Sequence, residues 1–351
     1  MGIFDIFKGK TLLGIDLGSR NIKIVEVEKA GDKLKLLNYI IINLEQGEKL
    51  SQILEVSQVF EENLGKILEA GVKEFKTKDV IYVIPSPYVF TTYFSLPYLP
   101  LSTLKNAVSY EARKYMPASI EDFIIEWRNN KFTPRLEEAT ERWFIFFTAT
   151  PKYFLEKLKN ISLIAGLNLK GIETEYFAIE NFFKNVPGNR VYIDLGYSYS
   201  NLIFIMNGNI TYSQKLNINA RSIIESISNL LKINLDGAED YMLKRGFNIP
   251  PEEEDVRNVL DGIIDAFSKE LSHSCEEINE KFNCRIEHIY LAGGMSLYSG
   301  FLDLFSEKFR DVPVSIFDPF QYIIISKKVK NLNLGPILVN AIGSCFKYFF
   351  S

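Results

Sequence analysis

Residues 13–43 of the chain read LGIDLGSRNIKIVEVEKAGDKLKLLNYIIIN, and residues 191–219 read VYIDLGYSYSNLIFIMNGNITYSQKLNIN. Both stretches contain the tetrapeptide Ile-Asp-Leu-Gly and continue with a polar turn, an apolar strand, a hairpin turn and a third strand. The hairpin turns fall at Gly31-Asp32 and at Asn207-Gly208, and Asn-Gly is a strong two-residue hairpin signal. Because the same three-strand meander occurs twice, we expect two similar domains that face each other across a cleft.

The composition is that of a globular protein with room for two domains. The chain has 351 residues, of which 47% are hydrophobic and 24% are charged. Lysine and arginine together number 40 against 44 acidic residues, which gives a net charge of −4. A nucleic-acid-binding protein normally has a basic excess, so we expect no nucleic-acid partner. The three cysteines form no C-x-x-C pair, which fits the reducing cytoplasm.

The sequence offers little that could span a membrane or act as a signal peptide. No apolar stretch reaches the ~18 residues needed to cross a bilayer. The first ten residues, MGIFDIFKGK, are too short and too polar for a signal peptide and form a small amphipathic tail. We expect this tail to dock on the protein or to be disordered, and contact with a membrane surface is the alternative.

The rest of the chain alternates helical and strand patterns, which is typical of an α/β fold. Apolar residues at helical spacing predict helices over residues 50–70, 101–115, 153–165, 259–282 and 301–309. Short apolar runs predict strands over residues 80–84, 123–129, 142–150 and 288–291.

Each meander places an aspartate at the end of a buried strand and a glycine two residues later, followed by hydroxyl or amide side chains. The sets are Asp16, Gly18, Ser19 and Asn21 in the first copy and Asp194, Gly196, Tyr197 and Ser198 in the second. Glycine lets a phosphate approach the backbone, and aspartate can hold Mg²⁺, usually through water. One such turn would most simply end a strand. Two copies predict a clamp for a di- or triphosphate, with one magnesium ion near Asp16 and Asp194.

A third candidate loop follows the strand predicted at residues 288–291. It reads Ala292-Gly293-Gly294-Met295. A Gly-Gly pair after a buried strand lets the backbone approach an adenosine group or its α-phosphate. The alternative is a tight connection from strand to helix.

The order of these three loops resembles the superfamily of actin, sugar kinases and heat-shock chaperone ATPases. Within it, residues 107–117, AVSYEARKYMP, are similar to the E-A-x-K-Y-I-P helix of the PilM family of type IV pilus assembly proteins. The resemblance runs from about residue 12 to residue 346 and includes Leu96-Pro97, Asp318-Pro319-Phe320 and Ala341-Ile342-Gly343. It implies an α/β fold of the actin-like, ribonuclease H-like type, with two lobes, duplicated βββαβα cores and inserted subdomains.

The resemblance also implies a division of the chain into four subdomains. Core subdomain 1A would comprise residues 1–86, 161–188 and 331–351, with the inserted subdomain 1C at residues 87–160. Core subdomain 2A would comprise residues 189–222 and 286–330, with the inserted subdomain 2B at residues 223–285.

By the same resemblance, the cleft would hold ATP or ADP with magnesium. Arg20 and Lys23 would complete the first phosphate loop, and Glu239 would contact the nucleotide. Glu175 would position the attacking water, and its alternative is a surface carboxylate at a helix start, which the helix dipole favours. Tyr197, Ser198 and Tyr199 stand where the family has small residues, so we expect weakened or shifted nucleotide binding. Proteins of this family resemble nucleotide-dependent scaffolds more than fast ATPases, so we expect at most slow hydrolysis.

The resemblance implies a partner as well. This would be the cytoplasmic tail of the inner-membrane protein PilN, bound between the first core and subdomain 1C, within residues 87–160. The chain would then be cytoplasmic and held at the inner face of the membrane by its partner, with self-association as a further expectation. Two alternatives are an FtsA-like polymerising division protein, which we expect to need a C-terminal membrane helix, and a sugar-type kinase, which would need an acidic base in a substrate pocket.

Overall fold

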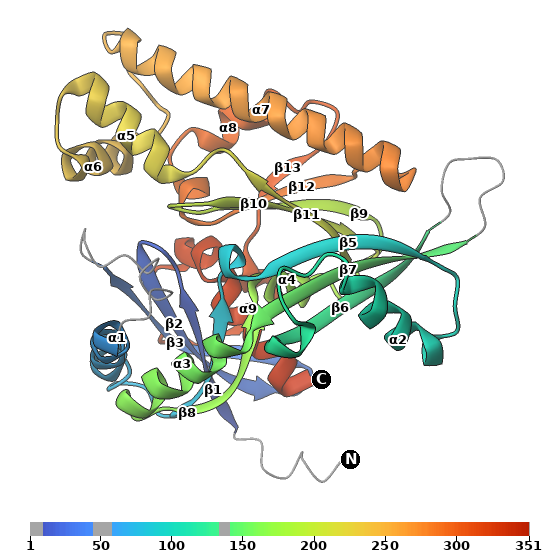
Figure 1. Ribbon diagram of the computed structural model, residues 1–351. Coiled ribbons are helices and arrows are strands. Elements are labelled where there is room, and N and C mark those ends of the chain that lie inside the picture. Colours follow the sequence, from blue (N-terminus) through green and yellow to red (C-terminus); the bar gives the residue numbers. More distant parts are fainter. Residues whose placement is uncertain (1–9, 45–57, 133–140, 351) are drawn as a thin grey trace.

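The structure is a computed structural model that describes residues 10–44, 58–132 and 141–350 (Figure 1). Its first sheet contains the strands β1 (Thr11–Leu17), β2 (Asn21–Ala30), β3 (Lys33–Asn43), β4 (Asp79–Ile84), β8 (Asn168–Thr174) and β14 (Ile324–Ile325). Their order is β14-β3-β2-β1-β4-β8. The first three strands form an antiparallel meander, and β4 and β8 extend the sheet in parallel.

The second sheet repeats this topology. It contains β9 (Asn189–Leu195), β10 (Ser200–Met206), β11 (Asn209–Leu216), β12 (His288–Ala292) and β13 (Val314–Ile316). Their order is β11-β10-β9-β12-β13, again with an antiparallel meander followed by two parallel neighbours. The predicted hairpin turns are confirmed, since Gly31, Asn207 and Gly208 adopt positive φ angles of 68°, 51° and 85°. The duplication expected from the sequence is therefore present in the fold.

A third, smaller sheet is inserted between β4 and β8. It consists of β5 (Phe90–Pro97), β6 (Phe123–Phe132) and β7 (Arg142–Pro151) in the antiparallel order β5-β7-β6. The helix α2 (Leu101–Ala112) covers it with the side chains of Leu104, Val108 and Ala112, which are buried. The insertion thus has a core of its own (Figure 1).

Two pairs of helices, each formed by segments far apart in the sequence, cover the two faces of the first sheet. The helices α1 (Gln58–Gly71) and α3 (Lys152–Ile164) pack together on one face. On the other face, α4 (Glu175–Glu180) and α9 (Val339–Phe350) lie between the first and second sheets (Figure 1). The main core of the first lobe continues through them to Tyr192 and Phe317 of the second, so the lobes share buried surface.

The second lobe carries four helices in the described part of the chain. They are α5 (Ala220–Leu231), α6 (Leu235–Arg245), α7 (Glu254–Phe282) and α8 (Phe301–Ser306). In Figure 1, α7 crosses the face of the second sheet that is turned away from the first. No helix in the described ranges is long and apolar enough to span a bilayer.

Some of the predicted segments lie partly outside the residues that the structure describes. The N-terminal tail and the start of the predicted helix at residues 50–57 lie outside the described residues. The four-subdomain division stays a prediction, and one strand pairing bears on it. Residues 324–325, assigned above to subdomain 2A, form β14 and pair with Lys35 and Leu36 of the first sheet.

Candidate functional site

The first aspartate–glycine turn joins β1 to β2. Asp16 and Lys23 face each other across these strands, and Asp16 Oδ2 lies 3.1 Å from Lys23 Nζ. The other carboxylate oxygen, Oδ1, is buried without a hydrogen-bond partner. A β-carbon at position 18 would lie 2.3 Å from Lys23 Nζ and 2.9 Å from the backbone oxygen of Asn21, so Gly18 leaves the room that the lysine needs.

The second turn joins β9 to β10 and is closed by the start of α5. The backbone N–H groups of Ala220 and Arg221 donate to the carbonyl oxygens of Gly196 and Tyr197 at 3.1 and 2.9 Å. Asp194 Oδ2 accepts a hydrogen bond of 3.2 Å from Nδ2 of Asn340 at the start of α9. The side chain of Asp194 is thus tied to the element that lies between the two sheets.

The Gly-Gly loop after β12 packs directly on the second turn. Gly293 has a φ of 81°, and a β-carbon there would lie 2.4 Å from the backbone oxygen of Leu195 and 2.6 Å from Asp194 Oδ1. Only glycine fits such a close approach. At Gly294 a β-carbon would meet nothing within 4 Å, and Met295 is buried.

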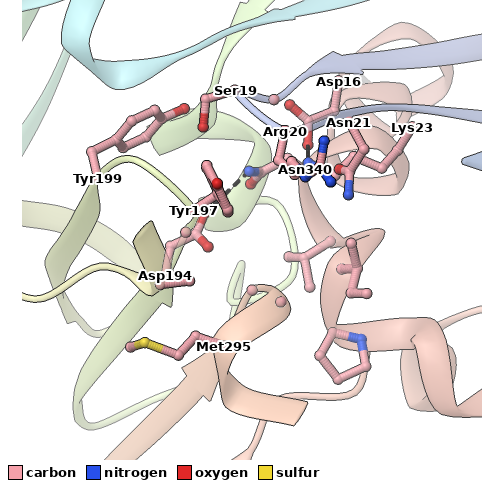
Figure 2. Close-up of a pocket in the computed structure, with 18 of the residues that line it drawn as sticks. Asp16, Ser19, Arg20, Asn21, Lys23, Asp194, Tyr197, Tyr199, Met295 and Asn340 are labelled. Atoms are coloured by element: carbon pink, nitrogen blue, oxygen red, sulfur yellow. Dashed lines mark hydrogen bonds and ion pairs between the residues drawn. The ribbon is translucent and has the colours of Figure 1, made fainter. Parts of the chain in front are cut away.

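The three loops open onto one cavity of about 210 Å³ between the lobes (Figure 2). The predicted site residues that line it are Asp16, Gly18, Ser19, Arg20, Asn21, Lys23, Glu175, Asp194, Gly196, Tyr197, Glu239, Gly293, Gly294 and Met295. Ser198 is exposed and is not part of the lining. The fold therefore brings both copies of the turn to the same space.

Negative charge is concentrated in this cavity. Burial, together with the charges of Asp194 and Asp16, raises the pKa of Glu175 to about 8. Burial and the charge of Asp16 also raise the pKa of Asp194, against the hydrogen bond from Asn340. A cation bound among these carboxyl groups would relieve their repulsion.

Glu175 is the first residue of α4, whose N-terminus is capped by the hydroxyl of Thr174. Its side chain is 3% exposed. The backbone N–H of Ser86 donates to Oε2 at 2.8 Å, and the hydroxyl of Tyr199 donates to Oε1 at 2.9 Å. The carboxyl group faces the cavity but already has a partner at each oxygen.

Arg20 and Glu239 join the two lobes across the cavity. Arg20 Nε and Nη2 donate to the two carboxylate oxygens of Glu239 at 3.1 and 2.9 Å. Nη1 donates to the carbonyl oxygen of Leu44, and the guanidinium lies 5.9 Å from the centre of the Tyr197 ring. Glu239 therefore lines the cavity, and its carboxylate is engaged by an arginine of the opposite lobe.

The sequence did not predict several lining residues, which are Tyr192, Tyr199, Ala220, Leu243, Tyr298, Pro336, Ile337, Val339 and Asn340. Asn340 adjoins the Ala341-Ile342-Gly343 motif, which was a signal for this segment. Tyr199 was noted only as a large residue where small ones are usual. Nothing local in the sequence marks the others.

The cavity suits a magnesium-bound nucleotide. The buried Oδ1 atoms of Asp16 and Asn340 have no hydrogen-bond partner, and oxygen ligands are what Mg²⁺ prefers. Within the described ranges, no three His, Cys, Asp or Glu side chains are arranged to bind a metal by themselves.

Known proteins were compared with the chain by sequence and by fold. The family model described as "Type IV pilus assembly protein PilM" matches residues 14–346. An uncharacterized protein of Acanthamoeba polyphaga mimivirus is 23% identical over 291 residues, which are 80% of this chain and 42% of that protein. The chain thus spans less than half the length of that relative.

Among solved structures, a PilM–PilN type IV pilus biogenesis complex superposes with a TM-score of 0.77 at 18% identity, over 98% of this chain and 100% of that chain. MreB5 of Spiroplasma citri bound to ADP gives 0.52 at 15% identity, over 97% of both chains. EutJ of Carboxydothermus hydrogenoformans gives 0.54 at 14% identity, over 98% of this chain and 90% of that chain. The fold is that of the actin-like ATPases. Since the family match extends over nearly the whole sequence, the chain belongs to the PilM family of type IV pilus assembly proteins.

Proposed function

We propose that the chain is a nucleotide-binding scaffold of type IV pilus assembly that binds the cytoplasmic tail of a PilN-like inner-membrane protein. The observation that carries this proposal is the cavity into which both aspartate–glycine turns open. Residues from both lobes line it, so a ligand held there would contact both lobes and bias their arrangement.

The ligand would be ATP or ADP with magnesium. The turns at Gly18 and Gly196 offer backbone to a phosphate, and Lys23 supplies positive charge beside Asp16. Leu243, Met295 and Tyr298 add apolar surface to the same lining, which suits a nucleotide base.

The partner site would lie where the insertion meets the first core. A small apolar pocket there is lined by Leu17, Ile84, Pro85, Tyr88, Phe154, Lys157 and Leu158. The solved structure that superposes with a TM-score of 0.77 is a complex of PilM with PilN, which supports a PilN-like partner for this chain. Through such a tail, the chain would be held at the inner face of the cytoplasmic membrane.

The two sites share structural elements. Leu17 lines the apolar pocket, and its neighbours Asp16 and Gly18 line the nucleotide cavity. Pro85 lines the pocket, and the next residue, Ser86, donates to Glu175. A change at the nucleotide would therefore reach the peptide through adjoining residues.

The experiment is a titration of a fluorescent PilN-type tail peptide into the full chain, with and without Mg-ATP. Tyr88→Ala removes a wall of the apolar pocket, and we expect it to weaken peptide binding about tenfold, as truncation of a buried aromatic contact does. Asp16→Asn should keep peptide binding without nucleotide but lose the effect of Mg-ATP on it. Asp311→Asn, at an exposed position, is the control.

Unchanged peptide affinity in Tyr88→Ala would place the partner elsewhere. An effect of Mg-ATP that survives in Asp16→Asn would argue against the nucleotide site. Co-sedimentation with ATP and lipid vesicles tests the alternative of a polymerising division protein, which the family match disfavours.

A further inference from the structure

The hydroxyl of Tyr199 and the backbone N–H of Ser86 together occupy the carboxyl group of Glu175. The distances are 2.9 Å from Tyr199 Oη to Oε1 and 2.8 Å from the Ser86 nitrogen to Oε2. With the side chain of Glu175 only 3% exposed, little of it remains for solvent.

Tyr199 reaches into the same space as the two aspartates. Its ring lines the cavity, and Figure 2 shows it extending from the second turn toward the first, where Ser19 lies. Burial raises the pKa of its phenol well above the usual value, and the charges of Glu175, Asp16 and Asp194 add to this. A water molecule that approaches Glu175 Oε1 from the cavity would compete with this hydroxyl for the carboxylate oxygen.

Two further contacts hold the segments that carry Tyr199 and Ser86 in place. A β-carbon at Gly196 would lie 2.4 Å from the carbonyl oxygen of Tyr199, so the turn that carries the tyrosine is tight. Asn201, on β10, donates a hydrogen bond of 2.6 Å to the hydroxyl oxygen of Ser86. The two segments that donate to Glu175 are therefore tied to one another.

This geometry bears on the hydrolysis of a bound nucleotide. A water oxygen attacks the γ-phosphorus while the bond from that phosphorus to the bridging oxygen breaks, which yields ADP and phosphate, and the proton of the water passes to a base. Glu175 lines the cavity. It can act as that base only when one of its oxygens accepts a hydrogen bond from the water.

We propose that Tyr199 is a positioning residue that withholds Glu175 from water, so that the chain retains bound ATP and hydrolyses it slowly. This inference rests on the proposed nucleotide-binding function. It assigns the slow turnover to one phenolic hydroxyl on the second turn.

Tyr199→Phe removes that hydroxyl and keeps the ring. In single-turnover assays of the full chain with Mg-ATP, we expect phosphate release at least about tenfold faster, which is part of the roughly 100- to 10,000-fold that a positioned acid or base contributes. Affinity for a fluorescent ATP analogue should stay the same. The double variant Tyr199→Phe, Glu175→Gln should return to the wild-type rate, because the gain acts through Glu175.

The pH profile separates this role from a merely structural one. Glu175 must be ionised to accept the proton, so the gain should grow with rising pH as this carboxyl group loses its proton. The titratable groups that face it are Asp16 on β1, Asp194 on β9 and the phenols of Tyr88, Tyr176, Tyr192 and Tyr199.

Tyr212→Phe is the matched control, since it removes a hydroxyl that donates to Gln214 on β11 outside the cavity. Tyr199→Leu is measured as a second variant that lacks the hydroxyl. If either Tyr199→Phe or Tyr199→Leu fails to fold, the other still tests the proposal. Wild-type turnover in a variant that binds nucleotide overturns the proposal, and so does a gain that persists without Glu175. If the wild-type chain binds no nucleotide, the analogue titration shows that the proposed function itself fails, and this inference with it.

Discussion

A single lysine forms ion pairs with two carboxyl groups where the lobes meet the insertion. Lys347 of α9 lies 3.2 Å from Oε2 of Glu173 on β8 and also pairs with Glu126 on β6. Glu173 is buried, and burial together with the charge of Glu126 raises its pKa to about 7, although Lys347 opposes the shift. The protonation state of Glu173 therefore changes with pH in the physiological range.

In the unfolded chain, a glutamate side chain has a pKa of about 4.3. Because the pKa of Glu173 is higher in the folded state, its protonation stabilises the fold fully below about 4.3, and this stabilisation is lost as the pH rises from there through 7. We predict that Glu173→Gln, which mimics the protonated form, reduces the fall in the free energy of unfolding between pH 5 and pH 8 by on the order of 2 kcal/mol. Urea unfolding at both pH values measures it, with the exposed Glu307→Gln as control. A pH dependence equal to that of the wild type would refute the assignment.

At the scale of elements, periodicity predicted some of the strands and helices that bury one face, such as α3 and α7, but it did not predict α5 or β5. The meanders and the strand at residues 288–291 were found because apolar runs and hairpin turns are local signals. Boundaries were less exact: α7 begins at Glu254, five residues before the predicted start, because its first turn is acidic and polar. The two-residue strand β14 was missed, since its pairing with β3 depends on a distant segment.

Helix α9 depends on a glycine where it crosses α4. A β-carbon at Gly343 would lie 2.2 Å from the carbonyl oxygen of Ala178, so any larger residue forces the two helices apart. We predict that Gly343→Ala lowers the free energy of unfolding by about 1–3 kcal/mol, as overpacking does. Gly262→Ala is the matched control, because its β-carbon would meet nothing within 4 Å on the exposed side of α7. That control should stabilise by about 0.5–1 kcal/mol through helix propensity alone. Equal effects of the two substitutions in urea unfolding would contradict the close crossing.

At the scale of the whole molecule, the site is assembled by packing that no local pattern encodes. The rings of Phe183, Tyr192 and Phe317 meet between the lobes, with centroids 5.3 to 6.2 Å apart. This contact sets how the two meanders face each other, and so which further side chains reach the cavity. The sequence predicted the three glycine loops because each is a local motif. It did not predict that Asn340 meets Asp194, since that contact depends on where α9 lies.

The ion pair of Arg20 with Glu239 closes the cleft at a distance from that shared core. Its side chains are 25% and 17% exposed, so the cost of removing both charges from water offsets much of their attraction, and we expect a net contribution of about 1 kcal/mol or less to global stability. Its larger effect should be local, because Glu239 lies on α6 and Arg20 on the opposite lobe. We predict that Arg20→Ala speeds amide hydrogen exchange in α6 while the midpoint of thermal unfolding stays nearly constant. Arg221→Ala breaks an ion pair within α5 alone, with Glu225, and should leave exchange in α6 unchanged. If exchange in α6 is the same in both variants, the pair does not hold the lobes together, and closure of the cleft must rest on the aromatic contact between the sheets.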